Sequence, residues 1–239
     1  MAKKLEIIVF VLFWAIFLLE WRKGYFAQFK SYLKNVQFNF YFRLFLLFAA
    51  LTVCLMLVDA PLLQEVQAIQ RPIFKSVLNL GAWLGKKCNL WAVVMVGYFL
   101  VLLFKNEKIS RIIFGALLSM GLTVNVSFII KHVLMRARPF NNLGPFSFFN
   151  LDGLLQDKNA LQSFPSGDVA VVAGVACFLF YTVKNSFLRY ALLIFPLATA
   201  LSRVWLNRHW PSDAIFSIGL GFISGLFIWR YEQHLRNLP

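Results

Sequence analysis

Six apolar runs, separated by segments rich in charged residues or proline, constrain this sequence more than any other feature. Within a lipid bilayer, a single segment satisfies its own backbone hydrogen bonds only as a helix. The runs cover residues 44–58, 90–104, 112–131, 168–183, 190–204 and 213–228. The sequence therefore predicts an all-α, polytopic membrane protein with six core transmembrane helices.

Composition agrees with this class and argues against two others. Hydrophobic residues make up 60% of the 239 positions and the mean hydropathy is +0.69, which is too apolar for a soluble globular domain. The net charge is +14, but the basic residues are scattered between the apolar runs rather than forming a stripe. We therefore expect cationic loops beside anionic lipid headgroups and no nucleic-acid partner. The three cysteines are widely separated, so neither a disulfide framework nor a thiolate metal site is expected.

Residues 1–43 are predicted to form a membrane-associated segment in front of a domain that spans 44–239. The apolar run 7–19 has no small-residue cleavage site after it, so a removable signal peptide is not expected. It is also short for a bilayer crossing, and an interfacial or re-entrant helix fits it at least as well. Residues 22–43 mix aromatic and basic side chains, which favours a helix in the headgroup layer. Residues 60–89 are interpreted as amphipathic helices on the outer surface.

Polar chemistry is concentrated in three short pieces between Lys131 and Asp213. These are Lys131 with Arg138-Pro139, then Pro165-Ser166-Gly167-Asp168, then Ser202-Arg203 with His209 and Asp213. Phosphate is a compact dianion that Arg binds through paired hydrogen bonds and Lys binds as a point charge, so the pieces suit a phosphoryl-transfer site. They fall at the end of the third run, the start of the fourth and between the last two. All three are therefore expected on one membrane face.

These pieces resemble the three-part signature of the type 2 phosphatidic acid phosphatase (PAP2) superfamily of membrane lipid phosphatases, from about Arg43 onward. The resemblance implies that His209 attacks phosphorus to form a phosphohistidine, and that Asp213 orients the ring and stabilises its charge. It also implies that the phosphate is bound by five groups, from Lys131, Arg138, Ser166, Gly167 and Arg203. No metal or cofactor is then expected, because the three cations supply the charge that Mg²⁺ provides elsewhere.

Local sequence adds detail to these assignments. Pro139 is expected to hold Arg138 extended, so that the cation leaves the helix and faces the site. Ser166 is also a good helix N-cap. Other candidates in the region are interpreted as interface residues: Arg136, Arg208, His132 and His234. The loop phenylalanines either guide acyl chains or are simple interface aromatics, and the second interpretation is preferred; they are Phe140, Phe146, Phe148 and Phe149.

Asp168 is the one departure from the family signature, which has a histidine there. That histidine protonates the leaving oxygen, and an ionised Asp cannot donate a proton. Three alternatives follow. Asp168 is kept protonated by desolvation, against the effect of the nearby cations; or the leaving group needs little acid help, as with a diphosphate or a sugar 1-phosphate; or the protein binds without hydrolysis. The second is preferred, because proton transfer is typically worth about 10² to 10⁴-fold.

The leading hypothesis is a metal-independent phosphatase acting on a membrane lipid, with lipid A 1-phosphate or a polyprenyl diphosphate as favoured substrate. The alternatives are a lipid-to-lipid phosphotransferase and a non-catalytic lipid-phosphate binding or transport protein. Of 24 basic residues, fourteen lie away from the motif face and ten lie on it if run 7–19 does not cross; if it crosses, each face has twelve. Because basic loops stay cytoplasmic, the site is expected to face the periplasm from the inner membrane. No oligomeric state is predicted.

Overall fold

The computed structural model describes residues 2–69, 72–149 and 158–237, and in these ranges the chain is helical with no strand. The helices are α1 (Ala2–Arg22), α2 (Phe29–Asn35), α3 (Phe38–Met56), α4 (Asp59–Ala68), α5 (Pro72–Leu84), α6 (Lys87–Leu103), α7 (Glu107–Leu134), α9 (Gly167–Thr182), α10 (Ser186–Leu192), α11 (Ile194–Trp205) and α12 (Pro211–Arg236). Two short 3-10 turns, Pro139–Asn141 and Lys158–Leu161, lie in the loop before α9. The predicted all-α class is confirmed.

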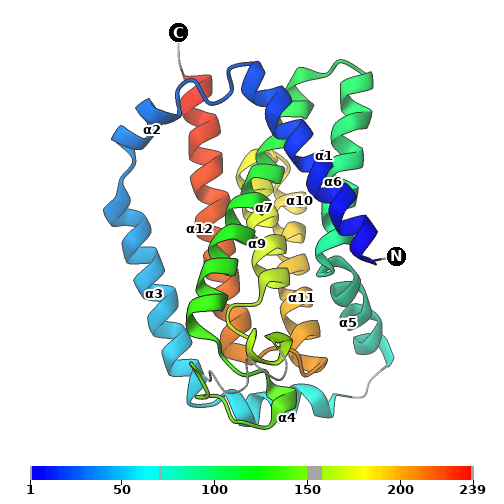
Figure 1. Cartoon of the computed structure of the whole chain (residues 1–239), viewed down its shortest axis with the longest axis vertical. Helices are drawn as coiled ribbons and strands as arrows, with labels where there is room; N and C mark the ends of the chain where they lie inside the picture. Colours follow the sequence, from blue (N-terminus) through cyan, green and yellow to red (C-terminus); the bar gives the residue numbers. More distant parts are fainter. Residues whose placement is uncertain (1, 70–71, 150–157, 238–239) are drawn as a thin grey trace.

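Five of the six apolar runs coincide with single helices of the bundle (Figure 1), whereas run 190–204 is divided between α10 and α11. Four described segments are long and apolar enough to cross a membrane: Phe38–Met56, Glu107–Asn141, Ser186–Trp205 and Pro211–Arg236. Asn89–Leu103 and Gly167–Thr182 are apolar but shorter. The chain is therefore a multi-pass membrane protein. α3 begins before the predicted start at 44 and α12 continues past the predicted end at 228, because amphipathic aromatic and basic residues extend a helix into the headgroup layer.

Small residues allow α9 to pack against α12 in the centre of the bundle. A Cβ atom placed on Gly221 would lie 2.4 Å from the Ala170 carbonyl oxygen, and one on Gly225 would lie 2.4 Å from the Gly174 carbonyl oxygen. The two backbones are therefore in direct contact, which is how helices associate when lipid removes the hydrophobic driving force. The close contact fixes the N-terminal ends of both helices beside each other, and both carry motif residues.

The turn after α1 and the helix α2 lie at the end of the bundle opposite the motif loops, and α1 runs from there obliquely along the side of the bundle (Figure 1). Ile16 of α1 is fully buried. Buried Glu20 accepts a hydrogen bond from Tyr98 of α6, and the Tyr25 hydroxyl donates to Glu232 of α12. These contacts join α1 and the turn after it to the same hydrophobic core as α7 and α9.

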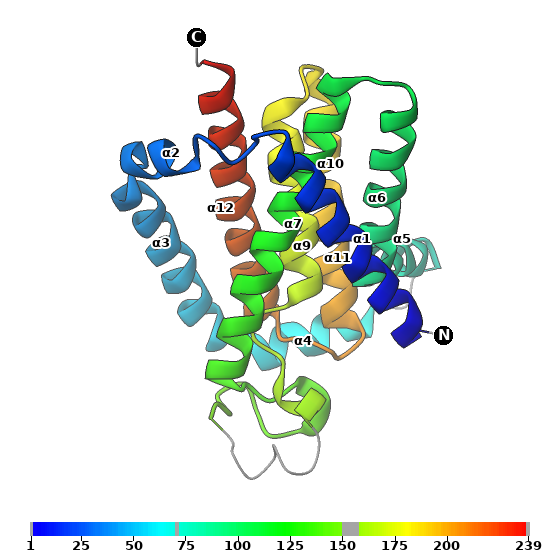
Figure 2. The same ribbon diagram turned by 45° about the horizontal axis from the view of Figure 1, so that its top comes forward.

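α4 lies across the end of the bundle where the motif loops gather (Figure 2). Its first residue, Asp59, is completely buried, and Leu63 packs in a cluster with Val204 of α11 and Trp210. α5 runs along α11, with Gly81 so close that a Cβ atom there would clash with the Ala198 carbonyl. The segment predicted to lie on the outer surface therefore also closes one side of the site.

Candidate active site

The first motif leaves α7 through a left-handed residue. Met135 has φ 43°, which turns the chain away from the helix axis, and Arg138 follows with φ −74° and ψ 152°. The extended conformation expected for Arg138 before Pro139 is confirmed. Lys131 lies in the last turn of α7 and its Nζ donates to the Gln162 carbonyl at 2.8 Å. Lys131 therefore comes just before the C-terminal end of α7 in the chain, and Arg138 comes just after it.

The second motif forms the N-terminus of α9. Ser166 is the N-cap and is fully buried, yet its side chain makes no capping hydrogen bond. Within the described residues no partner is found for its Oγ. Gly167 is the first residue of the helix, so the free N–H groups of the first turn and the positive end of the helix dipole both lie at Ser166 and Gly167. Ser166 and Gly167 therefore present donors suited to an anion.

The third motif places His209 between α11 and α12. Its Nδ1 lies 2.7 Å from the Ser163 carbonyl oxygen and 3.7 Å from Oδ2 of Asp213. The direct bond from carboxylate to ring that the sequence suggested is thus longer than a hydrogen bond, and a backbone carbonyl takes its place. A carbonyl only accepts, so Nδ1 carries the proton and Nε2 keeps its lone pair. Neutral His209 is held in the tautomer that a nucleophile needs.

Asp213 supports His209 through Ser163 and the loop. Its Oδ2 accepts hydrogen bonds from the Ser163 hydroxyl at 2.5 Å and from the Trp210 backbone N–H at 2.9 Å. The Trp210 indole in turn donates to the Ala137 carbonyl at 2.9 Å. The carboxylate therefore fixes the residue whose carbonyl holds the ring, and the loop carrying His209 is tied to the first motif.

Arg136 was interpreted as an interface anchor, and that interpretation is wrong. Its side chain is completely buried and forms ion pairs with Asp213 and with Asp59, the latter at 2.6 Å. It also donates to the Pro145 carbonyl and the Ser212 hydroxyl. A planar guanidinium with five donors can satisfy all of these acceptors at once, which a side chain extended toward water cannot do.

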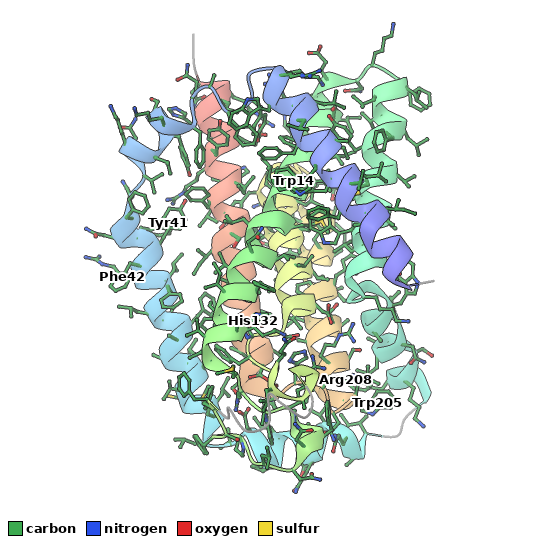
Figure 3. All side chains as sticks on the ribbon, viewed as in Figure 1. Trp14, Tyr41, Phe42, His132, Trp205 and Arg208 are labelled. Carbon is green, nitrogen blue, oxygen red and sulfur yellow. The ribbon has the colours of Figure 1, made fainter. Side chains whose placement is uncertain are left out.

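Asp59 completes this buried network and was missed by sequence reasoning. Its two oxygens accept from the Ser212 backbone N–H at 2.8 Å and the Ser212 hydroxyl at 2.5 Å, besides Arg136. Arg208, by contrast, is exposed at the same end of the bundle (Figure 3), as expected of an interface residue. The available signal was Asp59 itself, a carboxylate at the end of an apolar run, where charges are costly unless paired.

Asp168 forms an ion pair with Arg203. The Arg203 Nε lies 3.3 Å from Oδ2 of Asp168, and its Nη2 donates to the Ala82 carbonyl of α5 at 3.2 Å. Gly85 leaves room for this guanidinium, because a Cβ atom there would lie 2.7 Å from it. The Asp168 carboxylate is therefore engaged by a cation of the third motif.

The three motifs converge at one end of the bundle. The charges acting on His209 include Lys131, Arg138 and Asp213, and those acting on Arg138 include Asp168 and Arg203. Within the described chain, Nε of Arg138 and Oγ of Ser166 are buried without a hydrogen-bond partner. Buried donors are nearly always satisfied, so two unpaired donors in neighbouring motifs suit a bound anion. The roles predicted for the motif residues stay predictions.

Burial holds the pKa of His209 well below its ordinary value of 6.5, at about 4. The Asp213 carboxylate opposes this effect, while Lys131 and Arg138 add to it. A neutral imidazole at neutral pH can act as a nucleophile. Between pH 6.5 and 4 the unfolded chain binds a proton at this histidine that the folded protein does not bind. The neutral His209 ring therefore contributes its full share of stability above pH 6.5, and this contribution is lost as the pH falls toward 4.

We expect the His209 ring to stay neutral at pH 5, where an ordinary imidazole is mostly protonated. The measurement is a pH titration of ring ¹⁵N shifts in the ligand-free protein labelled at histidine, which has only three such residues. His209→Gln assigns the resonance by removing it. A midpoint for His209 near 6.5 would contradict the burial argument.

Fold and site together define a class: a helical membrane protein that gathers cationic side chains around a buried histidine at one end of its bundle. Comparison with known proteins agrees. Residues 112–237 match the model of the PAP2 superfamily. The chain therefore belongs to the PAP2 superfamily.

Two curated relatives illustrate the similarity. An undecaprenyl-diphosphatase from Sulfolobus acidocaldarius is 31% identical over 124 residues, covering 51% of this chain and 55% of that protein. The chain thus spans about half the length of that relative. A lipid A 1-phosphatase from Rhizobium etli is 28% identical over 197 residues, covering 74% of this chain and 78% of that protein.

Solved structures share the fold. The crystal structure of Aquifex aeolicus LpxE has a TM-score of 0.56 at 19% identity, with 72% of this chain and 95% of that one covered. A transmembrane PAP2-type phosphatidylglycerolphosphate phosphatase from Bacillus subtilis has a TM-score of 0.62 at 19% identity, with 83% and 98% covered. At these identities the likeness supports the architecture alone.

Proposed function

We propose that this protein removes phosphate from a membrane lipid by way of a phosphohistidine on His209, with its site on the periplasmic face of the inner membrane. The observation that carries the proposal is the setting of His209: a neutral ring with Nδ1 bonded to the Ser163 carbonyl, in the electrostatic field of Lys131 and Arg138. The unpartnered donors of Arg138 and Ser166 support phosphate binding at the same place.

In the first step, the Nε2 lone pair of His209 attacks phosphorus and the bond from phosphorus to the lipid oxygen breaks. The Nδ1 proton stays on the ring, donated to Ser163, and Asp213 at 3.7 Å offsets the positive charge that the ring acquires. Lys131, Arg138 and Arg203 stabilise the negative charge on the phosphoryl oxygens. In the second step, water attacks phosphorus, the bond to nitrogen breaks, and inorganic phosphate leaves.

Asp168 favours substrates whose leaving group departs without a proton. Its carboxylate is engaged by Arg203, and this ion pair places Arg203 beside the N-terminus of α9. When a diphosphate is cleaved, the leaving group is a phosphate monoester, and when a sugar 1-phosphate is cleaved, it is the anomeric oxygen of the sugar. Both leave more easily as anions than the alkoxide of a glycerolipid does. We therefore favour a polyprenyl diphosphate or lipid A 1-phosphate, the two substrate classes named for the relatives from Sulfolobus acidocaldarius and Rhizobium etli.

We expect purified protein to release phosphate from undecaprenyl diphosphate or lipid A 1-phosphate in the presence of a metal chelator, and to act poorly on phosphatidic acid. Asp168→His restores a proton donor and should raise turnover on phosphatidic acid at least about tenfold. The measurement is inorganic phosphate released from each lipid by both forms. Label transferred to an acceptor lipid would identify a phosphotransferase instead, and no turnover by either form would identify a binding protein.

A further inference from the structure

Arg208 directly precedes His209 in the chain, at the end of the bundle where the motif loops gather (Figure 3). Its exposure agrees with the interface residue expected from the sequence. Within the described residues, however, no hydrogen bond or ion pair is found for its guanidinium. A guanidinium has five N–H donors, so an arginine beside the nucleophile has donors left for a ligand.

The turn after α11 fixes the backbone of Arg208. Asn207 has the left-handed conformation, with φ 58°, which Asn adopts more readily than most residues. The Arg208 N–H donates to the Arg203 carbonyl at 3.1 Å, and the Asn207 N–H donates to the Val204 carbonyl at 2.9 Å. Together these two bonds form a Schellman motif, which closes the helix. The position of Arg208 is therefore set by the same helix end that carries Arg203.

The side chain of Arg208 reaches from the third motif toward the first. Its guanidinium lies over the Phe140 ring, 6.0 Å from the ring centre, and Phe140 follows Arg138 by two residues in a 3-10 turn. Of the charged side chains that act on Arg138, Arg208 has the largest effect. Coulombic interaction weakens with distance, so the two guanidinium groups are near neighbours. Because like charges repel, a bound anion beside both groups would stabilise this arrangement.

Arg208 lies farther out than the other cations of the site. Lys131, Arg138 and Arg203 are half-buried and the His209 ring is only 3% exposed, whereas Arg208 is exposed. A phosphate that reacts with the buried ring lies among the half-buried cations. A lipid enters from outside the bundle, so the group joined to that phosphate lies on the outer side, where Arg208 is.

We propose that Arg208 is a specificity-determining residue that binds the second phosphate of a diphosphate substrate, the one joined to the hydrocarbon chain. This inference rests on the proposed function. When Nε2 of His209 attacks the terminal phosphorus, the bond from that phosphorus to the bridging oxygen breaks, and the electron pair stays on the departing phosphate monoester. Arg208 stabilises the negative charge that this oxygen gains, so no proton transfer to it is needed. The substrate class selected is a polyprenyl diphosphate, because a sugar 1-phosphate has no second phosphate at this place.

Farnesyl diphosphate and farnesyl phosphate test the proposal, because they carry the same chain and differ by one phosphate. We expect Arg208→Ala to lower kcat/KM for the diphosphate at least about tenfold, through loss of charge-assisted hydrogen bonds, and to change kcat/KM for the monophosphate less than about threefold. Arg208→Lys keeps the charge and should lose less than Arg208→Ala on the diphosphate. An equal loss on both substrates, or no loss on the diphosphate, overturns the proposal.

Lys75→Ala is the matched control, because it removes another exposed cation, from α5. It should leave kcat/KM for both substrates within about threefold. A loss on the diphosphate as large as that of Arg208→Ala would overturn the proposal, since the effect would then come from the overall charge of the protein and not from a contact with Arg208.

Binding provides a readout that does not depend on turnover. In His209→Ala protein, adding Arg208→Ala should raise the Kd of farnesyl diphosphate at least about tenfold and that of farnesyl phosphate less than about threefold, by titration calorimetry in detergent. An equal change in the two Kd values contradicts the proposal. Failure of the wild-type protein to release phosphate from any lipid diphosphate would contradict the proposed function instead, while the two Kd values still test Arg208.

Discussion

His209→Ala is expected to lower turnover at least about 10³-fold, because removal of the nucleophile removes the covalent route altogether. The buried ring is held by Ser163 and lies in the field of Lys131 and Arg138, so no other histidine can take its place. The measurement is phosphate release in detergent. With a labelled lipid, rapid acid-free quenching should trap label on the wild-type protein and none on the variant.

His132→Ala is the matched control for this prediction. His132 lies at the same end of the bundle (Figure 3), but it is exposed and bonded to the Phe128 carbonyl of its own helix. Its replacement should leave turnover within about twofold, because it holds neither the ring nor the phosphate. Retention of full activity by His209→Ala would refute the phosphohistidine mechanism, whatever the control shows.

Arg136→Ala should lower the free energy of unfolding by about 3–5 kcal/mol, because it leaves two buried carboxylates without their partner. Asp59 and Asp213 are both completely buried and both pair with this guanidinium. Asp213 is then also free to shift, and with it Ser163 and His209. The measurement is thermal or denaturant unfolding in detergent, with turnover of the surviving folded protein as a second readout.

Arg208→Ala provides the comparison, since Arg208 is an exposed arginine of the same region. Its loss should change stability by less than about 0.5 kcal/mol. Asp59→Asn should cost less than Arg136→Ala, because Arg136 then keeps Asp213 and no carboxylate is left unpaired. A stability for Arg136→Ala equal to that of Arg208→Ala would show that the buried network contributes little to folding.

The motif residues illustrate what spacing along the chain can predict. The extended conformation of Arg138 follows from the proline beside it, and the position of Ser166 at a helix start follows from the apolar run after it. All three motifs are expected on one membrane face because an even number of predicted membrane crossings separates them. Each of these depends on a few neighbouring residues or on counting, so no tertiary information is needed.

The partner that holds His209 illustrates the opposite case. Sequence reasoning assigned Asp213, four positions away, as the direct partner of the ring. The structure gives that place to the Ser163 carbonyl, 46 positions away, and Asp213 acts on Ser163 instead. Every residue type carries a backbone carbonyl, so no sequence pattern indicates which carbonyl will contact the ring.

The apolar runs and the motif spacing alone identify this chain as a helical membrane protein of the PAP2 superfamily, and they predict the residues of its site. Only the folded bundle decides that Arg136 is a buried bridge between Asp59 and Asp213, carboxylates that each lie 77 positions from it. The physical reason is that helix formation and membrane burial are local properties of a segment, whereas charge pairing and lateral packing depend on which distant segments become neighbours.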